Sequence, residues 1–131
     1  NVTGIAGLLE GLRFIQRKSP EVILNHERFL AARCADALSA LPGVRVFAAP
    51  RLFCQAGVLS FQVDGMDCED VGQALGEQGI AVRSGLHCAP LAHRSAGTLD
   101  VGTIRVSFSA FNSSGDVDAL AGAVARLPRR Q

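Results

Sequence analysis

Leu59-Ser60-Phe61-Gln62-Val63 decides the fold, together with a second stretch of the same kind, Ile104-Arg105-Val106-Ser107-Phe108. Both stretches alternate apolar with polar residues. Successive side chains of a β-strand point to opposite faces, so this alternation predicts two half-buried strands. Two short apolar runs, Val44-Arg45-Val46-Phe47 and Ile80-Ala81-Val82, predict further strands. The sequence therefore predicts a sheet with one apolar face and one polar face.

Amphipathic patterns around these strands predict four helices, at residues 5–15, from Pro20 to about Leu41, from Asp67 to Gly79, and from Ser113 or Ser114 to Leu127. Ser19 is the candidate N-cap of the second helix, and Pro20 suits its first position. Helices that come first and then mix with strands indicate an α+β fold. We expect one domain over residues 1–131, a small, largely antiparallel sheet covered by helices on one side.

The composition argues against several classes of protein. The apolar fraction is 48%, as in globular domains, and no apolar run approaches the roughly 20 residues that cross a bilayer. The net charge is +1 and the basic residues are scattered, so neither a nucleic-acid surface nor a membrane partner is expected. The terminal pair Arg129 and Arg130 is expected to be a solvated tail.

The four cysteines form no C-x-x-C pair, so a structural metal site is not expected. No basic segment followed by a continuous apolar one opens the chain, so we predict reduced thiols and a cytoplasmic location. Cys34 and Cys68 lie on apolar helical stripes and are predicted to be core residues. Cys54 is predicted to pack in the core or at a strand edge.

The chain does not begin with methionine and holds a single lysine, Lys18. We expect an excised piece of a longer protein. Lys18 stands beside Ser19-Pro20, where a helix should end, and is expected to be solvated there.

A long irregular stretch is predicted from Ser84 to Gly102, and loops of this length are usually functional or disordered. It contains Cys88, with His87 before it and Arg83 nearby. An imidazole and a guanidinium can favour a thiolate, so Cys88 is a candidate nucleophile. The competing interpretation, a packed loop thiol beside a histidine whose hydrogen bonds are satisfied, explains the same residues equally well. A metal site made by His87, Cys88 and His93 is disfavoured, because a fourth ligand is missing.

Arg105 is the second candidate site residue. The alternation places it on the polar face of its strand, where a fixed guanidinium suits bidentate recognition of a carboxylate. A solvent-exposed arginine in a weak surface pair is the competing interpretation.

The motif R-x-G-x-H-C-A, supplied by Arg83, Gly85, His87, Cys88 and Ala89, resembles that of class V aminotransferase-fold enzymes, in the branch of cysteine desulfurases and selenocysteine lyases. Residues 102–107, Gly-Thr-Ile-Arg-Val-Ser, and residues 111–113, Phe-Asn-Ser, are similar to the arginine strand and the aromatic-Asn-Thr turn of that branch. The likeness follows the whole chain in element order and is most specific from Gly79 to Leu120.

The resemblance implies that the chain is the C-terminal small domain of a fold-type I enzyme, with pyridoxal phosphate held mainly by a large domain. It implies that Cys88 removes sulfur from L-cysteine or a related small amino acid, becoming a persulfide and leaving alanine. Arg105 would bind the substrate carboxylate, Arg83 would lie at the active site, and His87 would lie beside the nucleophile. A homodimer is implied, as is a sulfur-acceptor protein serving iron–sulfur cluster assembly.

Three departures from the family pattern bear on substrate choice: a single histidine before the cysteine, an altered segment from Arg94 to Val101, and Phe111 in place of the commoner tyrosine. Cysteine and selenocysteine therefore remain alternative substrates. Two other functions compete, a stand-alone sulfur carrier or thiol-binding module that uses Cys88 without a cofactor, and a structural domain with an idle cysteine.

Overall fold

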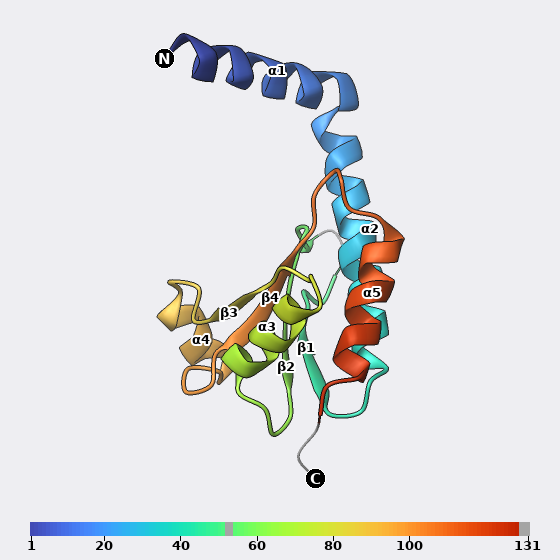
Figure 1. The fold of residues 1–131 in the computed structure, drawn as a ribbon, viewed down its shortest axis with the longest axis vertical. Helices are drawn as coiled ribbons and strands as arrows, with labels where there is room; N and C mark the ends of the chain where they lie inside the picture. Colours follow the sequence, from blue (N-terminus) through green and yellow to red (C-terminus); the bar gives the residue numbers. More distant parts are fainter. Residues whose placement is uncertain (52–53, 129–131) are drawn as a thin grey trace.

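A computed structural model describes residues 1–51 and 54–128, and over these residues the chain forms five helices and four strands (Figure 1). In chain order they are α1 (Val2–Lys18), α2 (Pro20–Ser39), β1 (Val44–Phe47), β2 (Val58–Val63), α3 (Cys68–Glu77), β3 (Arg83–Gly85), α4 (Pro90–Ala96), β4 (Thr103–Ser107) and α5 (Ser114–Ala125). Arg129 and Arg130, the predicted solvated tail, lie outside the described residues.

The strands form one sheet in the order β1-β2-β4-β3, and each neighbouring pair is antiparallel. The two alternating stretches pair with each other at its centre, where Leu59 lies opposite Val106 and Phe61 opposite Ile104. All four side chains are buried. The predicted small antiparallel α+β sheet is thereby confirmed, and the alternation correctly assigned its two faces.

Three helices, α2, α3 and α5, cover the apolar face of the sheet. Their buried side chains form one core with those of β2 and β4. The core includes Leu30, Cys34 and Leu38 from α2, Val71 and Leu75 from α3, and Val117, Leu120, Ala123 and Val124 from α5. Removing a large side chain from such a core costs about 2–5 kcal/mol. The short helix α4 lies on the opposite face, so helices do not cover one side alone as expected.

The helices α3 and α5 start where the sequence predicts them, and side chains cap both starts. The Asp67 carboxylate accepts a hydrogen bond from the Glu69 backbone N–H at 2.8 Å at the start of α3. At α5 the Asp116 carboxylate accepts from the Ser113 backbone N–H at 2.8 Å, as in a capping box. Ser19 precedes α2 as predicted, but its hydroxyl donates to the Glu21 carboxylate instead of capping the backbone.

Helix α1 extends away from the sheet and its covering helices (Figure 1). Its apolar stripe, defined here as Val2, Ile5, Leu8, Leu9, Leu12 and Ile15, is 42–85% exposed, and α1 buries no residue. Near its C-terminal end, Phe14 stacks on Phe111, and the two ring centroids are 5.2 Å apart. The predicted helix is present, but the core described above does not use its apolar side.

The predicted strand at residues 80–82 is wrong, because pairing begins three residues later, at Arg83. The Ile80 backbone N–H donates to the Leu75 carbonyl at 3.0 Å and so closes the end of α3. Gly79 allows this turn through its φ of 76°. Ile80 and Val82 pack against the core, which explains their apolar character.

Within residues 1–51 and 54–128, none of the helices has the length and apolar character needed to cross a membrane.

Candidate functional site

The site is built on the polar face of the sheet. Strand β3 is at the edge of the sheet and pairs with β4, so that Arg83 lies opposite Arg105 and Gly85 opposite Thr103. On the other side of β4, Arg105 lies opposite Ser60. Two of the sequence-predicted residues, Arg83 and Arg105, are therefore brought side by side.

Arg105 is half-buried, and its Nε atom is buried with no hydrogen-bond partner among the described residues. Within the same residues neither Arg105 nor Arg83 makes an ion pair with a carboxylate. Like charges placed directly opposite each other on a sheet are unfavourable. Two unneutralised guanidiniums, one with a buried free N–H group, therefore suit the binding of a small anion such as a carboxylate.

His87 lies against the start of β4. Its Nε2 atom is 3.1 Å from the Thr103 carbonyl oxygen and 3.2 Å from the Thr103 hydroxyl. A carbonyl oxygen only accepts, so Nε2 carries the hydrogen and Nδ1 holds a lone pair when the ring is neutral. Nδ1 is buried and has no partner among the described residues.

Burial lowers the pKa of the His87 imidazole, and the positive charge of Arg105 is the next cause. The ring is thus neutral near pH 7 and offers an unused acceptor atom, as a general base requires.

Cys88 follows in a turn closed by a hydrogen bond from the Ala89 backbone N–H to the Leu86 carbonyl, at 2.9 Å. Its side chain is exposed, as expected for a candidate nucleophile. His87 and Cys88 have φ values of 52° and 58°. This left-handed region costs non-glycine residues about 1–3 kcal/mol each, and it persists only where the surroundings enforce it.

The predicted long loop from Ser84 to Gly102 is wrong in its extent. Ser84 and Gly85 belong to β3, and α4 occupies residues 90–96. Two signals could have revealed α4, because Pro90 stands at its first position and Gly97 ends it with a φ of 67°. Its seven residues are too few to show an amphipathic pattern.

Sequence reasoning missed the role of three buried polar residues, His93, Thr98 and Thr103, which are 6%, 1% and 4% exposed. His93 Nδ1 and the Thr98 hydroxyl oxygen are 2.8 Å apart. The rings of His87 and His93 are neighbours, with centroids 5.8 Å apart and planes tilted by 42°. No signal in the sequence brings Thr103 to these positions, because its approach depends on the pairing of β3 with β4.

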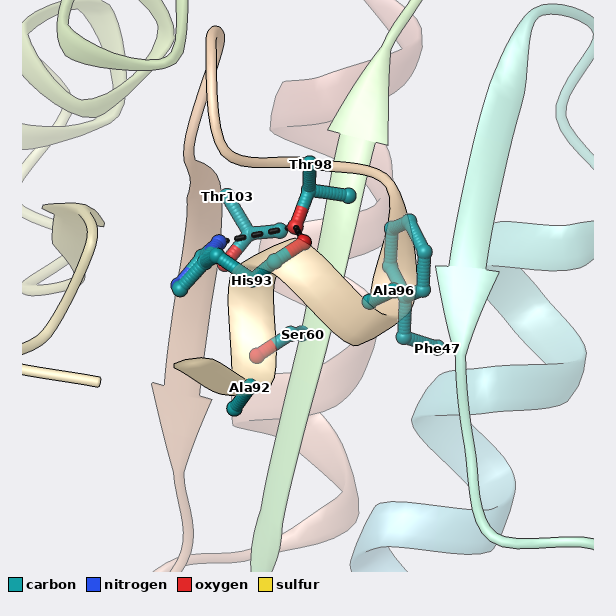
Figure 2. A pocket seen from close by; sticks show the side chains of 7 residues that line it. All are labelled: Phe47, Ser60, Ala92, His93, Ala96, Thr98 and Thr103. Atoms are coloured by element: carbon teal, nitrogen blue, oxygen red, sulfur yellow. Dashed lines mark hydrogen bonds between the residues drawn. The ribbon is translucent and has the colours of Figure 1, made fainter. Parts of the chain in front are cut away.

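Figure 2 shows a pocket of about 180 Å³ on this polar face, between α4 and strands β1, β2 and β4. It is lined by Phe47, Ser60, Ala92, His93, Ala96, Thr98 and Thr103. The side chains of His93 and Thr98 point toward each other at its wall (Figure 2). The four predicted site residues do not line this pocket, although Ser60 and Thr103 are strand partners of Arg105 and Gly85.

Two glycines allow the close approach on which this arrangement depends. Gly85 has a φ of 101° and Gly102 a φ of 65°. A Cβ atom at Gly102 would lie 3.0 Å from Gly85 backbone atoms and from the Cys68 sulfur. Both positions thus favour glycine for conformational reasons.

The remaining cysteines differ in burial. Cys34 and Cys68 are core residues as predicted, and burial raises the pKa of Cys34 to about 12 and also raises that of Cys68. Cys54 was expected to be packed, but it is exposed. Its backbone N–H donates to the Arg51 carbonyl in a turn, and β2 begins only at Val58. Over the described residues, no three histidine, cysteine or acidic side chains gather as a metal site would require.

The chain is similar to proteins of known family. The family model described as Aminotransferase class-V matches residues 1–120. A probable cysteine desulfurase of Mycolicibacterium paratuberculosis is 38% identical over 127 residues, which are 97% of this chain and 18% of that protein. The apo structure of a cysteine desulfurase from Thermococcus onnurineus NA1 superimposes with a TM-score of 0.85 at 35% identity, covering 95% of this chain and 30% of the other.

A third similar protein is a mutant of C-DES with glycine covalently linked to its PLP cofactor, at a TM-score of 0.67 and 26% identity. The match covers 94% of this chain and 29% of that one. The chain therefore spans less than a third of the length of each of these three proteins.

Proposed function

Because these residues belong to the aminotransferase class-V family, we propose that they form the C-terminal small domain of a pyridoxal-phosphate-dependent cysteine desulfurase. The enzyme would take sulfur from L-cysteine, leaving alanine and a persulfide on Cys88. One observation carries the proposal: the exposed thiol of Cys88 directly follows the neutral imidazole of His87, and both backbones lie in the left-handed region. The same motif contains Arg83, which lies opposite Arg105.

The arginine pair would bind the substrate carboxylate. Arg105 is the better placed of the two, because it lies on the inner strand β4 and has a buried N–H group without a partner. Arg83, exposed on the edge strand, would add positive charge. A guanidinium binds a carboxylate through two parallel hydrogen bonds, which fixes the orientation of the amino acid.

Cys88 would attack the substrate sulfur as a thiolate. A new S–S bond forms and the substrate C–S bond breaks. The electron pair of that bond stays on the substrate carbon, which takes up a proton, so cysteine and one thiol give alanine and one persulfide. His87 Nδ1 is an acceptor without a partner among the described residues, and can hold a proton released by a thiol in this step.

Pyridoxal phosphate, when bound, supplies the electron sink that makes the substrate sulfur removable. Lys18 does not fit the role of its lysine, because it is exposed as the last residue of α1. A Schiff-base lysine needs a pocket that lowers its pKa. We therefore propose that the cofactor is held by parts of the protein outside residues 1–131.

The exposure of Cys88 also supports transfer of the persulfide sulfur to an acceptor protein, because a thiolate of the acceptor can reach it. A role in iron–sulfur cluster assembly, a cytoplasmic location and a homodimer are proposed from the family resemblance.

The test is mass spectrometry of the intact holoenzyme after incubation with L-cysteine. Cys88 should carry one added sulfur, and Cys88→Ser should abolish both persulfide and alanine formation. Cys54→Ser is the matched control, because Cys54 is the other exposed cysteine among the described residues, and it should retain activity. Alanine formation by Cys88→Ser at the wild-type rate would refute the assignment. Persulfide formation without a cofactor, from an added donor only, would instead identify a sulfur carrier.

A second variant tests the anion site. Arg105→Ala should lower kcat/KM for cysteine roughly a hundredfold, since a buried charge-assisted pair contributes about 3 kcal/mol. Arg45→Ala is the control, because Arg45 is an arginine of the other edge strand, β1. Its guanidinium stacks over the Phe47 ring, 4.8 Å from the ring centroid. Equal kinetics of the two variants would contradict the role of Arg105.

A further inference from the structure

We propose that His93 and Thr98 are positioning residues for the sulfur-transfer step. Their buried side-chain hydrogen bond joins α4 to the turn that follows it and keeps the His93 ring beside that of His87. It thereby holds Cys88 in its left-handed backbone conformation. The inference rests on the proposed function of Cys88.

The conformation to be held is unusual. His87 and Cys88 are consecutive non-glycine residues with positive φ, and such a pair relaxes unless both of its ends are fixed. On the upstream side, β3 pairs with β4 and the His87 ring is bonded to Thr103. The downstream side leads through Ala89 into α4, so α4 must supply the second fixed point.

A relay of backbone hydrogen bonds runs from Ala89 back to β4. The His93 N–H donates to the Ala89 carbonyl at 3.1 Å, the Thr98 N–H to the His93 carbonyl at 2.9 Å, and the Gly102 N–H to the Thr98 carbonyl at 2.9 Å. Gly102 directly precedes β4. His93 and Thr98 are therefore the two intermediate positions of a closed path from the nucleophile back to the sheet.

The side chains of the same two residues anchor this path. Helix α4 has seven residues and no side-chain cap, and helices this short are not stable without tertiary contacts. His93 is its buried residue, whereas Leu91, its largest apolar side chain, is 70% exposed. A buried imidazole requires a hydrogen-bond partner, and Thr98, 1% exposed, supplies it at 2.8 Å. This contact closes the turn that ends α4, and the His93 ring that it orients lies 5.8 Å from the ring of His87, the residue before Cys88.

The test compares Thr98→Val with Thr98→Ser in the intact holoenzyme. Valine keeps the volume and removes the hydroxyl, whereas serine keeps the hydroxyl. Three quantities are measured: the single-turnover rate of persulfide formation on Cys88, KM for cysteine, and the rate of Cys88 alkylation by iodoacetamide. Thr98→Val should lower the persulfide rate at least tenfold, leave KM within twofold, and leave alkylation unchanged or faster. Thr98→Ser should stay within threefold of wild type in all three.

This pattern separates positioning from a merely structural role, because general damage would also change KM and cofactor content. A persulfide rate of Thr98→Val within threefold of wild type overturns the inference, as does a parallel loss of persulfide formation and alkylation. If Thr98→Val does not fold, the pair His93→Asn and His93→Gln replaces it. Asparagine places an amide near the original Nδ1 position and should retain most of the rate, whereas glutamine should lose at least tenfold. Equal rates, or failure of both to fold, overturn the inference.

The Cys88→Ser variant distinguishes failure of the proposed function from failure of the positioning role of His93 and Thr98. If it still turns over cysteine, the proposed function fails and the positioning role fails with it. If it is inactive while Thr98→Val is normal, only the positioning role fails.

Discussion

Among single residues, the cysteines divide into two that the fold buries, Cys34 and Cys68, and two that it exposes, Cys54 and Cys88. The thiolate is the reactive form, and at pH 8 a pKa of about 12 leaves Cys34 with roughly one thiolate in ten thousand. Iodoacetamide should therefore modify Cys88 and Cys54 in the folded protein at least a hundredfold faster than Cys34 and Cys68. Peptide mapping measures this, and labelling in denaturant, where all four should react, is the control. Rapid labelling of Cys34 without denaturant would contradict the described core.

His87 couples the stability of the site to pH. Burial lowers its pKa in the folded protein below the usual value of 6.5. Between the two pKa values the imidazole is protonated in the unfolded chain but not in the folded chain. The free energy of unfolding therefore falls as the pH drops below about 6.5 toward the lower pKa of the folded protein. In His87→Gln, which can still donate to the Thr103 carbonyl, the loss of thermal stability between pH 7 and pH 5 should be smaller. Above pH 7.5 the two stability curves should run parallel, and parallel curves throughout would show that His87 does not contribute.

For single residues, the sequence could indicate which residues belong to the site but not which side chains contact one another. The alternation around Arg105 was sufficient to assign it to the polar face. The contact of His87 with Thr103 depends on strand register over 16 positions, which no local pattern encodes. Cys54 was assigned wrongly because it was placed at the entrance of a strand that in fact begins at Val58.

Between elements, one close approach lies where Gly102 leads into β4 beside Gly85. Gly102→Ala should destabilise the protein by about 1–3 kcal/mol, because its φ of 65° disfavours alanine and the new Cβ would meet the backbone at 3.0 Å. Gly76→Ala is the matched control in α3, where a Cβ meets nothing within 4 Å and alanine favours the helix. Chemical denaturation of the intact protein measures both. A Gly102→Ala variant as stable as Gly76→Ala would contradict the close approach.

Elements were predictable where a long pattern or a side-chain cap marks them. The strands around Phe61 and Ile104 and the helix beginning after Asp67 fall in this class. Helix α4 and strand β3 do not, because α4 is too short to show an amphipathic pattern and β3, Arg83-Ser84-Gly85, contains no apolar residue. The position of β3 is determined by its pairing with β4, which lies further along the chain. The strand prediction at Ile80 and Val82 was wrong because these apolar side chains pack against the core without their backbone pairing with another strand.

For the whole molecule, α1 contributes no side chain to the core that α2, α3 and α5 form with the sheet. Its stripe leaves large apolar side chains exposed, which marks an interaction surface or a tendency to self-associate. Residues 1–131 alone should therefore associate with increasing concentration, whereas residues 19–131 should remain monomeric. Light scattering tests this, and circular dichroism of the shorter chain should still show a cooperative melt, because the core lies outside α1. Loss of that melt would mean that α1 stabilises the fold.

The segment between Gly85 and Thr103 starts and ends at two positions that face each other across one strand pair. Its ends are thus held together by the sheet whatever lies between them. Doubling the length of a flexible loop closed in this way adds only about 0.6 kcal/mol of entropic cost. Insertions and deletions between Pro90 and Val101 are therefore tolerated by the sheet far more readily than changes within β3 or β4. Over evolutionary time this segment is where related chains can diverge in length, while the arginine pair of β3 and β4 stays in register.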